Sequence, residues 1–308
     1  MARSIAAAEA DGLRSHGLMR LSSYCEHAAI GKVDGHAVPT VVHARPAAWI
    51  ADARDRFAHP AIEAGFEALV PGAKAQGIAL LAVTNPYNCG VVGHHVERLA
   101  SHGLVALAFA NTPAAIAPWG RSQPLFGTNP LAFAAPRAAG PPLVVDQSSS
   151  VVARGEVMLA GARGEPIPSG WALDRDGAPT TDPGAALAGS MLPTGGHKGA
   201  GLALIVEILA AALTGANFSF EASSFANAEG GPPRTGQFFV AVDPRAILGG
   251  VFAERVERLI ETMTAPADVR VPGARRIEAR EIATEKGGEV EKGLWERVVA
   301  LGEAGRLR

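Results

Sequence analysis

Cysteine is scarce in this sequence, and charge of neither sign predominates. Cys25 and Cys89 are the only two cysteines among 308 residues; they are too few for a disulfide framework and lack the spacing of a metal site. The formal net charge is −2, and no block of like charges occurs. These features argue against a disulfide scaffold and against nucleic acid as a partner.

Long apolar runs and targeting patterns are absent as well. A helix that crosses a bilayer needs roughly 20 consecutive apolar residues, and no run reaches that length. Glu9 and Asp11 interrupt the N-terminal apolar run, so the pattern of a secretory signal peptide is lacking. We therefore expect a cytoplasmic protein with no membrane partner.

The standard nucleotide-binding motifs are also missing. The dinucleotide fingerprint G-x-G-x-x-G follows a strand directly. Gly199 and Gly201 supply its first two glycines, but Leu204 occupies the third position and a Pro/Gly-rich loop precedes them. No Walker loop, zinc-ligand spacing or G-x-S-x-G motif occurs. A nucleotide cofactor would therefore need a fold other than the Rossmann fold.

What the sequence does contain is an alternation of short apolar runs and amphipathic stretches. With 48% hydrophobic residues it can bury a sizeable core. Apolar runs bounded by turn residues predict strands, and the 3.6-residue periodicity predicts helices. The predicted strands cover residues 77–83, 104–110, 143–146 and 237–242, and the predicted helices 61–76, 92–101, 151–162 and 247–264. This alternation indicates an α/β protein.

The stretch 191–220 combines a glycine-rich loop with a strongly apolar helix. Residues 202–213 are apolar except for Glu207, which predicts a helix buried on all sides. Ahead of it, His197 and Lys198 lie between glycines at the expected helix N-terminus. Backbone N–H groups, the helix dipole and an ammonium would suit a phosphate or carboxylate there. A flexible loop with a solvated lysine is the alternative.

Two polar clusters are candidates for chemistry. Ser15 has the position of a helix N-cap, and His16 and Arg20, four residues apart, would share a helix face. An arginine fork grips a carboxylate, and a histidine exchanges protons near neutral pH. The second cluster is Asp146 with residues 147–150 at a strand exit. The alternatives are surface side chains for the first cluster and helix-capping serines for the second.

Taken together, six motifs in this order resemble the malate/L-lactate dehydrogenase type 2 family. They are Ser15-His-Gly-x-x-Arg20, Gly127-Thr128-Asn-Pro-x-Ala-Phe, Asp146 with its serines, Gly170-Trp-Ala-Leu-Asp174, Pro179-Thr-Thr-Asp-Pro183 and Gly195-Gly-His-Lys-Gly199. Within that family the sequence resembles the Δ1-piperideine-2-carboxylate/Δ1-pyrroline-2-carboxylate reductases most. The signals are residues 31–39, 123–127, 196–198 and 213–221.

The resemblance implies a non-Rossmann NAD(P)-binding α/β fold, with a mixed sheet and flanking helices, in a homodimer. We expect a cofactor-binding domain over residues 46–245 and a helical lobe made from residues 1–45 and 246–308. The expected substrate is a small acid with its carboxylate beside the reacting carbon, here a cyclic imino acid.

The resemblance also assigns roles to individual residues. Arg20 would hold the substrate carboxylate, with Asn88 and Thr128 beside the substrate. His16 would handle the proton, with Ser15 and Asp146 tuning it. The residues expected to hold the cofactor are Gln147, Ser148, Ser149, His197, Lys198, Pro272 and Gly273. Because a 2′-phosphate needs a nearby cation, Arg275 or Arg276 would favour NADPH, with NADH also possible.

Two departures from the family pattern leave three hypotheses open. Hydroxy-acid dehydrogenases of the family carry a Ser-x-His motif after the strand ending at Val83, and Asn88 takes the place of that histidine. Family members usually have another helix before the Ser-His-Gly motif, whereas 14 residues precede Ser15 here. The first hypothesis is an imino-acid reductase, and the second a 2-hydroxy-acid dehydrogenase with malate-, lactate- or ureidoglycolate-like substrates. The third is a catalytically silent homologue that binds the cofactor.

Overall fold

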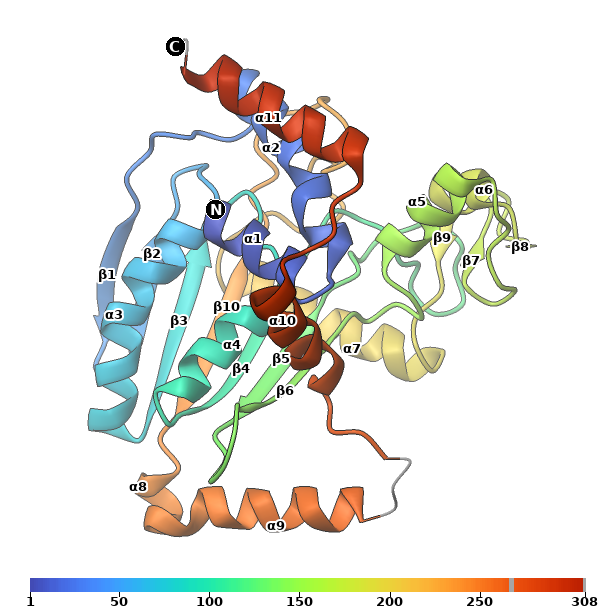
Figure 1. Cartoon of the computed structure of the whole chain (residues 1–308). Helices are drawn as coiled ribbons and strands as arrows, with labels where there is room; N and C mark the ends of the chain where they lie inside the picture. The colour runs from blue at the N-terminus through green and yellow to red at the C-terminus, as the bar shows by residue number, and fades with distance from the viewer. Residues whose placement is uncertain (266–268, 307–308) are drawn as a thin grey trace.

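A seven-stranded mixed sheet forms the centre of the molecule (Figure 1). The computed structural model describes residues 1–265 and 269–306. The strand order is β1-β2-β3-β10-β4-β5-β6, in which β2 and β3 run parallel and the other neighbours antiparallel. The strands are β1 (Thr40–Arg45), β2 (Ala48–Asp52), β3 (Ile78–Thr84), β4 (Val105–Ala110), β5 (Leu131–Ala135), β6 (Leu143–Gln147) and β10 (Gln237–Val242). The predicted α/β organisation is confirmed.

Helices α3 (Ala58–Gln76) and α4 (Val92–Ser101) pack against the sheet and fill its main core. Every second residue of β3 is buried, as expected for a strand with one face on a helix. Gly65 of α3 lies so near Leu81 that an added Cβ would be 2.5 Å from the leucine Cδ2. Glycine at this position therefore allows the helix to approach the strand closely.

Helix α7 (His197–Glu207) continues into a π-helical turn, Ile208–Ala212. The prediction of a helix buried on all sides is wrong. Val206 and Ala210 are buried in a cluster with β4 and β10, whereas Ile205 and Ile208 are 52% and 51% exposed. The apolar composition reflects two apolar faces, of which the chain covers one.

The N- and C-terminal helices lie side by side on one side of the sheet (Figure 1). Helix α1 (Ala2–Ala10) contacts α10 (Ala274–Lys286), and α2 (Leu21–Ala29) contacts α11 (Lys292–Arg306). The helical lobe stays a prediction, but its boundary at residue 45 separates β1 from β2, which pair with each other.

The predicted helix 247–264 is interrupted in the structure. It consists of α8 (Arg245–Leu248), a 3-10 turn at Gly249–Val251 and α9 (Phe252–Thr264). Gly249 has a φ of 70°, which ends the first helix because a right-handed helix needs negative φ.

A smaller three-stranded sheet lies beside the main one. It is built from β7 (Ala172–Leu173), β8 (Pro179–Thr180) and β9 (Ser190–Met191) and is flanked by α5 (Arg154–Arg163) and α6 (Pro183–Ala188). Among residues 1–265 and 269–306, no helix is both long and apolar enough to cross a bilayer.

Candidate active site

One cavity, about 540 Å³ in volume, gathers residues that are far apart in the sequence. The 3-10 turns before α2, the loop after β3, the loop before β5 and the end of β6 all contribute to its wall. Eight of the predicted site residues line it: Ser15, His16, Arg20, Asn88, Thr128, Asp146, Gln147 and Ser148. The predicted substrate and proton-handling residues therefore share one cavity.

The Ser-His-Gly motif adopts two 3-10 turns in place of the start of a helix. The predicted N-cap role of Ser15 is wrong, because Ser15 lies inside the turn Arg14–His16 and α2 begins only at Leu21. Its hydroxyl lies 3.1 Å from Nδ1 of His16, and its carbonyl accepts a hydrogen bond from Nε of Arg20 at 2.7 Å. The turns, rather than a helix face, bring the three side chains together.

The guanidinium of Arg20 has donors left for a ligand. Its Nε is bonded to the backbone, and neither terminal NH2 group is hydrogen-bonded to a residue that the structure describes. No described carboxylate forms an ion pair with it. A substrate carboxylate would receive two N–H donors in the fork geometry that suits it.

His16 is neutral near physiological pH. Burial, followed by the positive charge of Arg20, lowers its pKa to about 4. An anion bound to Arg20 would offset that second cause and raise the pKa of His16. The histidine thus responds to the charge of the ligand that Arg20 holds.

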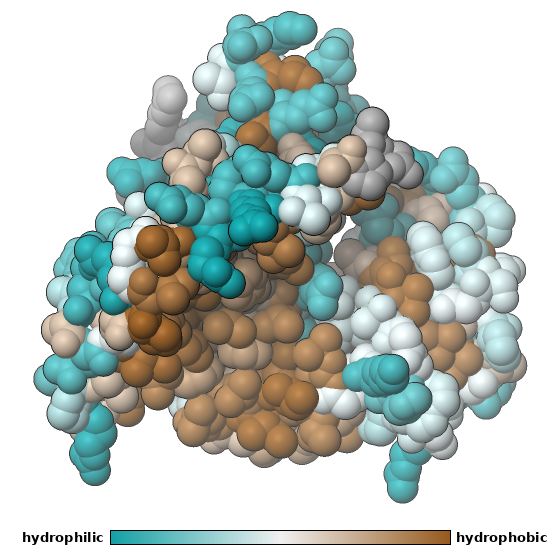
Figure 2. Space-filling view, turned by 90° about the horizontal axis from the view of Figure 1, so that it is seen from below, coloured by the Kyte–Doolittle hydropathy of each residue, from teal (hydrophilic) through white to brown (hydrophobic). Residues whose placement is uncertain are grey.

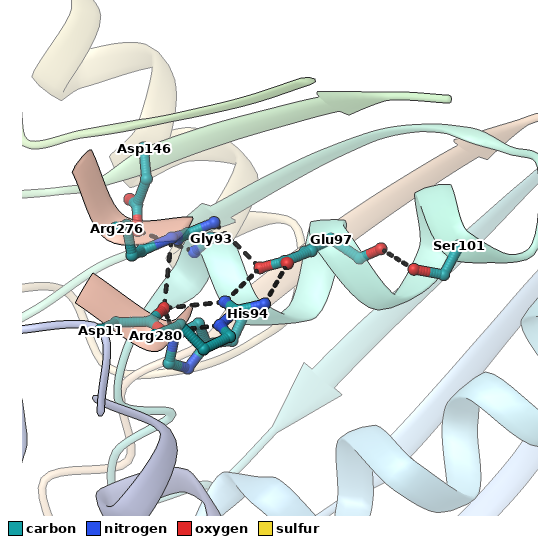
Figure 3. A network of polar contacts seen from close by, with 8 residues as sticks. All are labelled: Asp11, Gly93, His94, Glu97, Ser101, Asp146, Arg276 and Arg280. Carbon is teal, nitrogen blue, oxygen red and sulfur yellow. Dashed lines mark hydrogen bonds and ion pairs between the residues drawn. The ribbon is translucent and has the colours of Figure 1, made fainter. Parts of the chain in front are cut away.

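Asp146 connects the cavity to a buried polar network (Figure 3). Its Oδ2 accepts a hydrogen bond from the backbone N–H of Gly93 at 2.8 Å. Burial raises the pKa of Asp146, and the Gly93 N–H and the charge of Arg276 oppose that shift. A Cβ on Gly93 would lie 2.6 Å from Asp146 Oδ2 and 2.7 Å from Arg276 Nη1. The glycine therefore lets both groups approach the start of α4.

Arg276 belongs to that network and is only 8% exposed. It donates a hydrogen bond to Glu97 at 2.9 Å and forms an ion pair with Asp11 at 3.3 Å. The prediction that Arg276 could meet a cofactor phosphate conflicts with these contacts, because its guanidinium is already paired inside the protein. Arg275, the other predicted candidate, is exposed at the start of α10.

Asp11 is the centre of the same network, which joins the end of α1 to α4 and α10. It accepts hydrogen bonds from Arg280 at 2.7 and 2.9 Å and contacts His94 at 2.9 Å. Burial alone would raise the pKa of Asp11, but the bonds from Arg280 and His94 lower it to about 2. His94 thus has a structural role, because its ring holds the buried carboxylate of Asp11.

Asn88 presents its carboxamide to the cavity with its oxygen already occupied. Its Oδ1 accepts hydrogen bonds from the Tyr24 hydroxyl at 3.1 Å and from the Gly90 N–H at 2.6 Å. An amide has no proton-accepting nitrogen. Asn88 can orient a substrate but cannot act as the base that its position holds in hydroxy-acid dehydrogenases.

The residues predicted to hold the cofactor lie partly inside and partly outside the cavity. Gln147 and Ser148 line it, whereas the Ser149 side chain is buried and donates a hydrogen bond to the Asn129 carbonyl at 2.8 Å. The carbonyl of Ser149 accepts a hydrogen bond from Thr194 N–H at 2.9 Å, which joins this strand exit to the loop before α7.

The remaining predicted cofactor residues are on that loop and on the turn before α10. His197 and Lys198 are exposed in the first turn of α7, and neither lines the cavity. The turn at Pro272 and Gly273 packs against β6, where a Cβ on Gly273 would be 3.1 Å from the Val144 carbonyl. The cofactor role of these four residues stays a prediction, and they lie outside the lining of the cavity.

Several cavity residues carried no sequence signal that we recognised. Tyr24, Arg154 and Phe225 line the cavity from α2, from α5 and from the loop 221–234. Each comes from a segment that looks like ordinary helix or loop in sequence. The only indication for Arg154 was its position just after the serines at residues 148–150, which we interpreted as possible helix caps.

Comparison with known proteins agrees with the fold and the cavity. A profile of the malate/L-lactate dehydrogenase family matches residues 1–299. The (2R)-3-sulfolactate dehydrogenase (NADP(+)) of Chromohalobacter salexigens is 50% identical over 290 residues, which are 94% of this chain and 86% of that protein. The Δ1-pyrroline-2-carboxylate reductase of Ancylobacter novellus is 42% identical over 308 residues, 99% of this chain and 90% of that protein.

The solved structures give the same relationship in three dimensions. The crystal structure of Δ1-piperideine-2-carboxylate reductase from Pseudomonas syringae pvar. tomato is similar with a TM-score of 0.92 and 41% sequence identity. The similarity covers 97% of this chain and 90% of that one. The chain therefore belongs to the malate/L-lactate dehydrogenase family and is a nicotinamide-dependent oxidoreductase.

Proposed function

We propose that this enzyme reduces cyclic imino acids, converting Δ1-pyrroline-2-carboxylate or Δ1-piperideine-2-carboxylate into L-proline or L-pipecolate. The observation that carries the proposal is that two residues line one cavity. They are Arg20, whose terminal NH2 groups have no hydrogen-bond partner among the described residues, and Asn88, which cannot act as a base. Oxidation of a hydroxyl group needs a base for its proton, whereas a protonated imine is already electrophilic. Relatives named as pyrroline-2-carboxylate or piperideine-2-carboxylate reductases, 38–43% identical to this chain, support the same reaction.

In this reaction the chain positions the acid and manages one proton. Arg20 holds the carboxylate, which fixes C2 at a constant place in the cavity. A bound reduced nicotinamide would supply the hydride for C2; as the C=N double bond becomes a single bond, the nitrogen of the protonated imine would keep its proton. His16, whose pKa the bound carboxylate raises, supplies or maintains that proton on nitrogen. Asp146 and Ser15 set the orientation of the His16 ring and the charge around it.

The cofactor we propose is NADPH, bound in a manner unlike the Rossmann fold. Gln147 and Ser148 at the exit of β6 would lie beside the nicotinamide end, and the outer surface near Lys198 and Gly273 beside the phosphates. Arg275 is the exposed cation available for a 2′-phosphate, because Arg276 is paired internally. The sulfolactate dehydrogenase relative is named with NADP(+), which agrees with this preference.

A second candidate is oxidation of 3-sulfolactate or a similar dianionic 2-hydroxy acid. Arg154 lines the cavity, donates one hydrogen bond to the Leu187 carbonyl at 3.1 Å and has no carboxylate partner among the described residues. Burial lowers its pKa, as expected for a desolvated cation without a counter-ion. A sulfonate or second carboxylate would supply that counter-ion, and the 50% identical relative bears the name of such an enzyme.

We also propose that the enzyme is a homodimer that uses the uncovered side of α7. Exposed large apolar side chains are present on α7 and its π-turn and on α9, where Leu259 is 65% exposed. Figure 2 shows apolar residues gathered over a wide area of the side seen from below. Soluble proteins rarely leave a wide apolar area uncovered, so a second copy of the chain is the proposed cover.

The reaction is tested by measuring turnover of the cyclic imines beside the oxo acids and 3-sulfolactate. Reduction of the imines in preference to the others supports the proposal. Binding of NADPH without turnover of any of them would support the silent-homologue hypothesis.

A further inference from the structure

The loop 221–234, which we name the roof loop, forms one wall of the cavity. Ala222, Ser224, Phe225 and Ala226 line the cavity from this loop. Its sequence is polar and rich in glycine and proline. In the structure it has no regular helix or strand, yet several side chains of other segments hold it.

The strongest of these contacts comes from Lys32, whose side chain is almost completely buried at 2% exposure. Its ammonium donates hydrogen bonds to three backbone carbonyls of the roof loop, those of Ser224 at 2.7 Å, Asn227 at 3.0 Å and Glu229 at 2.5 Å. An ammonium has three N–H donors, so every donor is used. The three carbonyl oxygens of the loop therefore surround the ammonium group.

The arrangement is unusual because Lys32 is buried without an ion pair among the described residues. A buried charge is unfavourable unless its surroundings compensate for it, and burial lowers the pKa of Lys32. Among the residues that the structure describes, backbone dipoles and the more distant charge of Glu229 offset that effect. The buried cation therefore directs all of its donors at one loop, the loop that lines the cavity.

Two further contacts hold the roof loop, one inside the stretch that Lys32 bonds to and one at the end of the loop. The ring of Phe225 lies 5.2 Å from that of Tyr87, centroid to centroid. Arg234 at the loop's end forms a two-point ion pair with Asp55, at 2.7 and 2.9 Å. Lys32 bonds to the loop backbone at residues 224, 227 and 229 and so spans this stretch of the loop.

We propose that Lys32 is a positioning residue. It shapes the substrate cavity by bonding to three backbone carbonyls of the roof loop and so holding that loop in place. Lys32 does not line the cavity, so it acts through the loop. The proposal needs the cavity of the proposed function to be the active site. It does not need the substrate to be an imine, because its effect is measured with whichever acid the wild-type enzyme converts.

The experiment compares Lys32→Ala with Lys286→Ala, a control that removes an exposed lysine of α10. Losing three buried hydrogen bonds should raise the KM for the acid roughly tenfold or more, while kcat and the Kd for NADPH change much less. Methylammonium should lower the KM of Lys32→Ala again by entering the carbonyl cage. Tetramethylammonium, which has no N–H donor, should not.

A Lys32→Ala enzyme with the wild-type KM would overturn the proposal, as would equal effects of the two ammonium ions. If Lys32→Ala does not fold, Lys32→Arg takes its place, because a planar guanidinium cannot direct its donors as an ammonium does. Amide hydrogen exchange in residues 221–234 should then be faster than in the wild type. Unchanged exchange would contradict the proposal. Because exchange is measured without a substrate, this holds even if the wild-type enzyme converts none of the tested acids. Such a lack of turnover would refute only the proposed function.

Discussion

Two arginines in the cavity have different partners and therefore different expected roles. Arg20 donates to the Ser15 carbonyl, its terminal NH2 groups have no hydrogen-bond partner among the described residues, and it lines the same cavity as His16, the proposed proton-handling residue. Within the described part of the chain, the Arg154 side chain is hydrogen-bonded to the Leu187 carbonyl alone. The first suits the carboxylate next to the reacting carbon, which every candidate substrate carries. The second matters only for a substrate with another anionic group.

Substituting each arginine separates the two candidate functions. Arg20→Ala should raise the KM and lower kcat/KM for all acids by about 10- to 100-fold, because a charged hydrogen-bonded contact contributes roughly 1.5–3 kcal/mol. Arg154→Gln should leave cyclic-imine reduction nearly unchanged and lower kcat/KM for 3-sulfolactate about tenfold or more. Steady-state kinetics with both substrates measures this, and equal losses in Arg154→Gln would remove the basis of the second candidate.

His16 should affect turnover more than substrate binding. His16→Gln keeps a polar side chain but removes the group that exchanges the proton, so kcat should fall about 100-fold with little change in KM. His102→Gln, at an exposed position after α4, is the matched control. A His16→Gln enzyme with full kcat would show that solvent or another group handles the proton.

The sequence alone was enough to predict site residues that belong to one short motif. Ser15, His16 and Arg20 were predicted as one cluster, and they do lie together in the cavity. The predicted local structure of this cluster was wrong, because a serine before an apolar stretch is equally compatible with a helix N-cap and with a 3-10 turn. Arg276 could not be recognised as internal, since its partners Asp11 and Glu97 are far away in sequence.

Among the elements, α3 and α4 are joined by a pair of buried histidines. The ring centroids of His59 and His95 lie 5.8 Å apart, and both ring nitrogens of His59 are buried with no hydrogen-bond partner in the described part of the chain. Burial, with the charge of neighbouring groups, lowers the pKa of His59 well below 6.5. At pH values between the folded and unfolded pKa of His59, the unfolded chain therefore binds a proton at this residue that the folded protein does not.

This difference predicts the direction of acid destabilisation. A histidine whose pKa is lower in the folded state favours folding fully above the unfolded pKa of 6.5, and that contribution is lost as the pH falls. His59→Leu should remove this part of the loss, so that the variant gains about 1–2 kcal/mol on the wild type between pH 6.5 and pH 5.

Urea denaturation at a series of pH values measures that gain. His36→Leu, at an exposed position, is the matched control and should follow the wild type. Parallel pH dependences for His59→Leu and the wild type would mean that His59 is solvated or paired in the folded protein.

Element boundaries were predicted well where periodicity alone decides them. The helix 92–101 and the strand 237–242 have the predicted limits. The helix 247–264 was predicted without its break because Gly249 and Gly250 leave the apolar periodicity intact. A positive φ at Gly249 depends on contacts that periodicity does not describe.

At the scale of the whole molecule, the apolar side of α7 determines the expected assembly. Residues 202–213 are apolar except for Glu207, and this composition led to the wrong prediction of a helix buried on all sides. Only the structure shows that one apolar face is left uncovered, with Ile208 51% exposed. The homodimer that the resemblance implies stays a prediction, and this face is where we place its interface.

A charge on that face should weaken the dimer. Ile208→Asp should raise the dimer dissociation constant at least about tenfold, because a buried unpaired carboxylate is unfavourable at an interface. Val38→Asp is the matched control, since Val38 is 69% exposed on the segment before β1. Sedimentation equilibrium measures both, and a wild-type chain that is monomeric at all concentrations would contradict the assignment of this face.

The central claim is that this cavity reduces cyclic imines, and one measurement tests it most directly. NADPH oxidation is followed with Δ1-pyrroline-2-carboxylate, Δ1-piperideine-2-carboxylate, pyruvate and oxaloacetate, and NADP+ reduction with 3-sulfolactate. The account predicts that kcat/KM is highest for a cyclic imine, with little turnover of the oxo acids. Turnover of 3-sulfolactate or an oxo acid without turnover of either imine would contradict it.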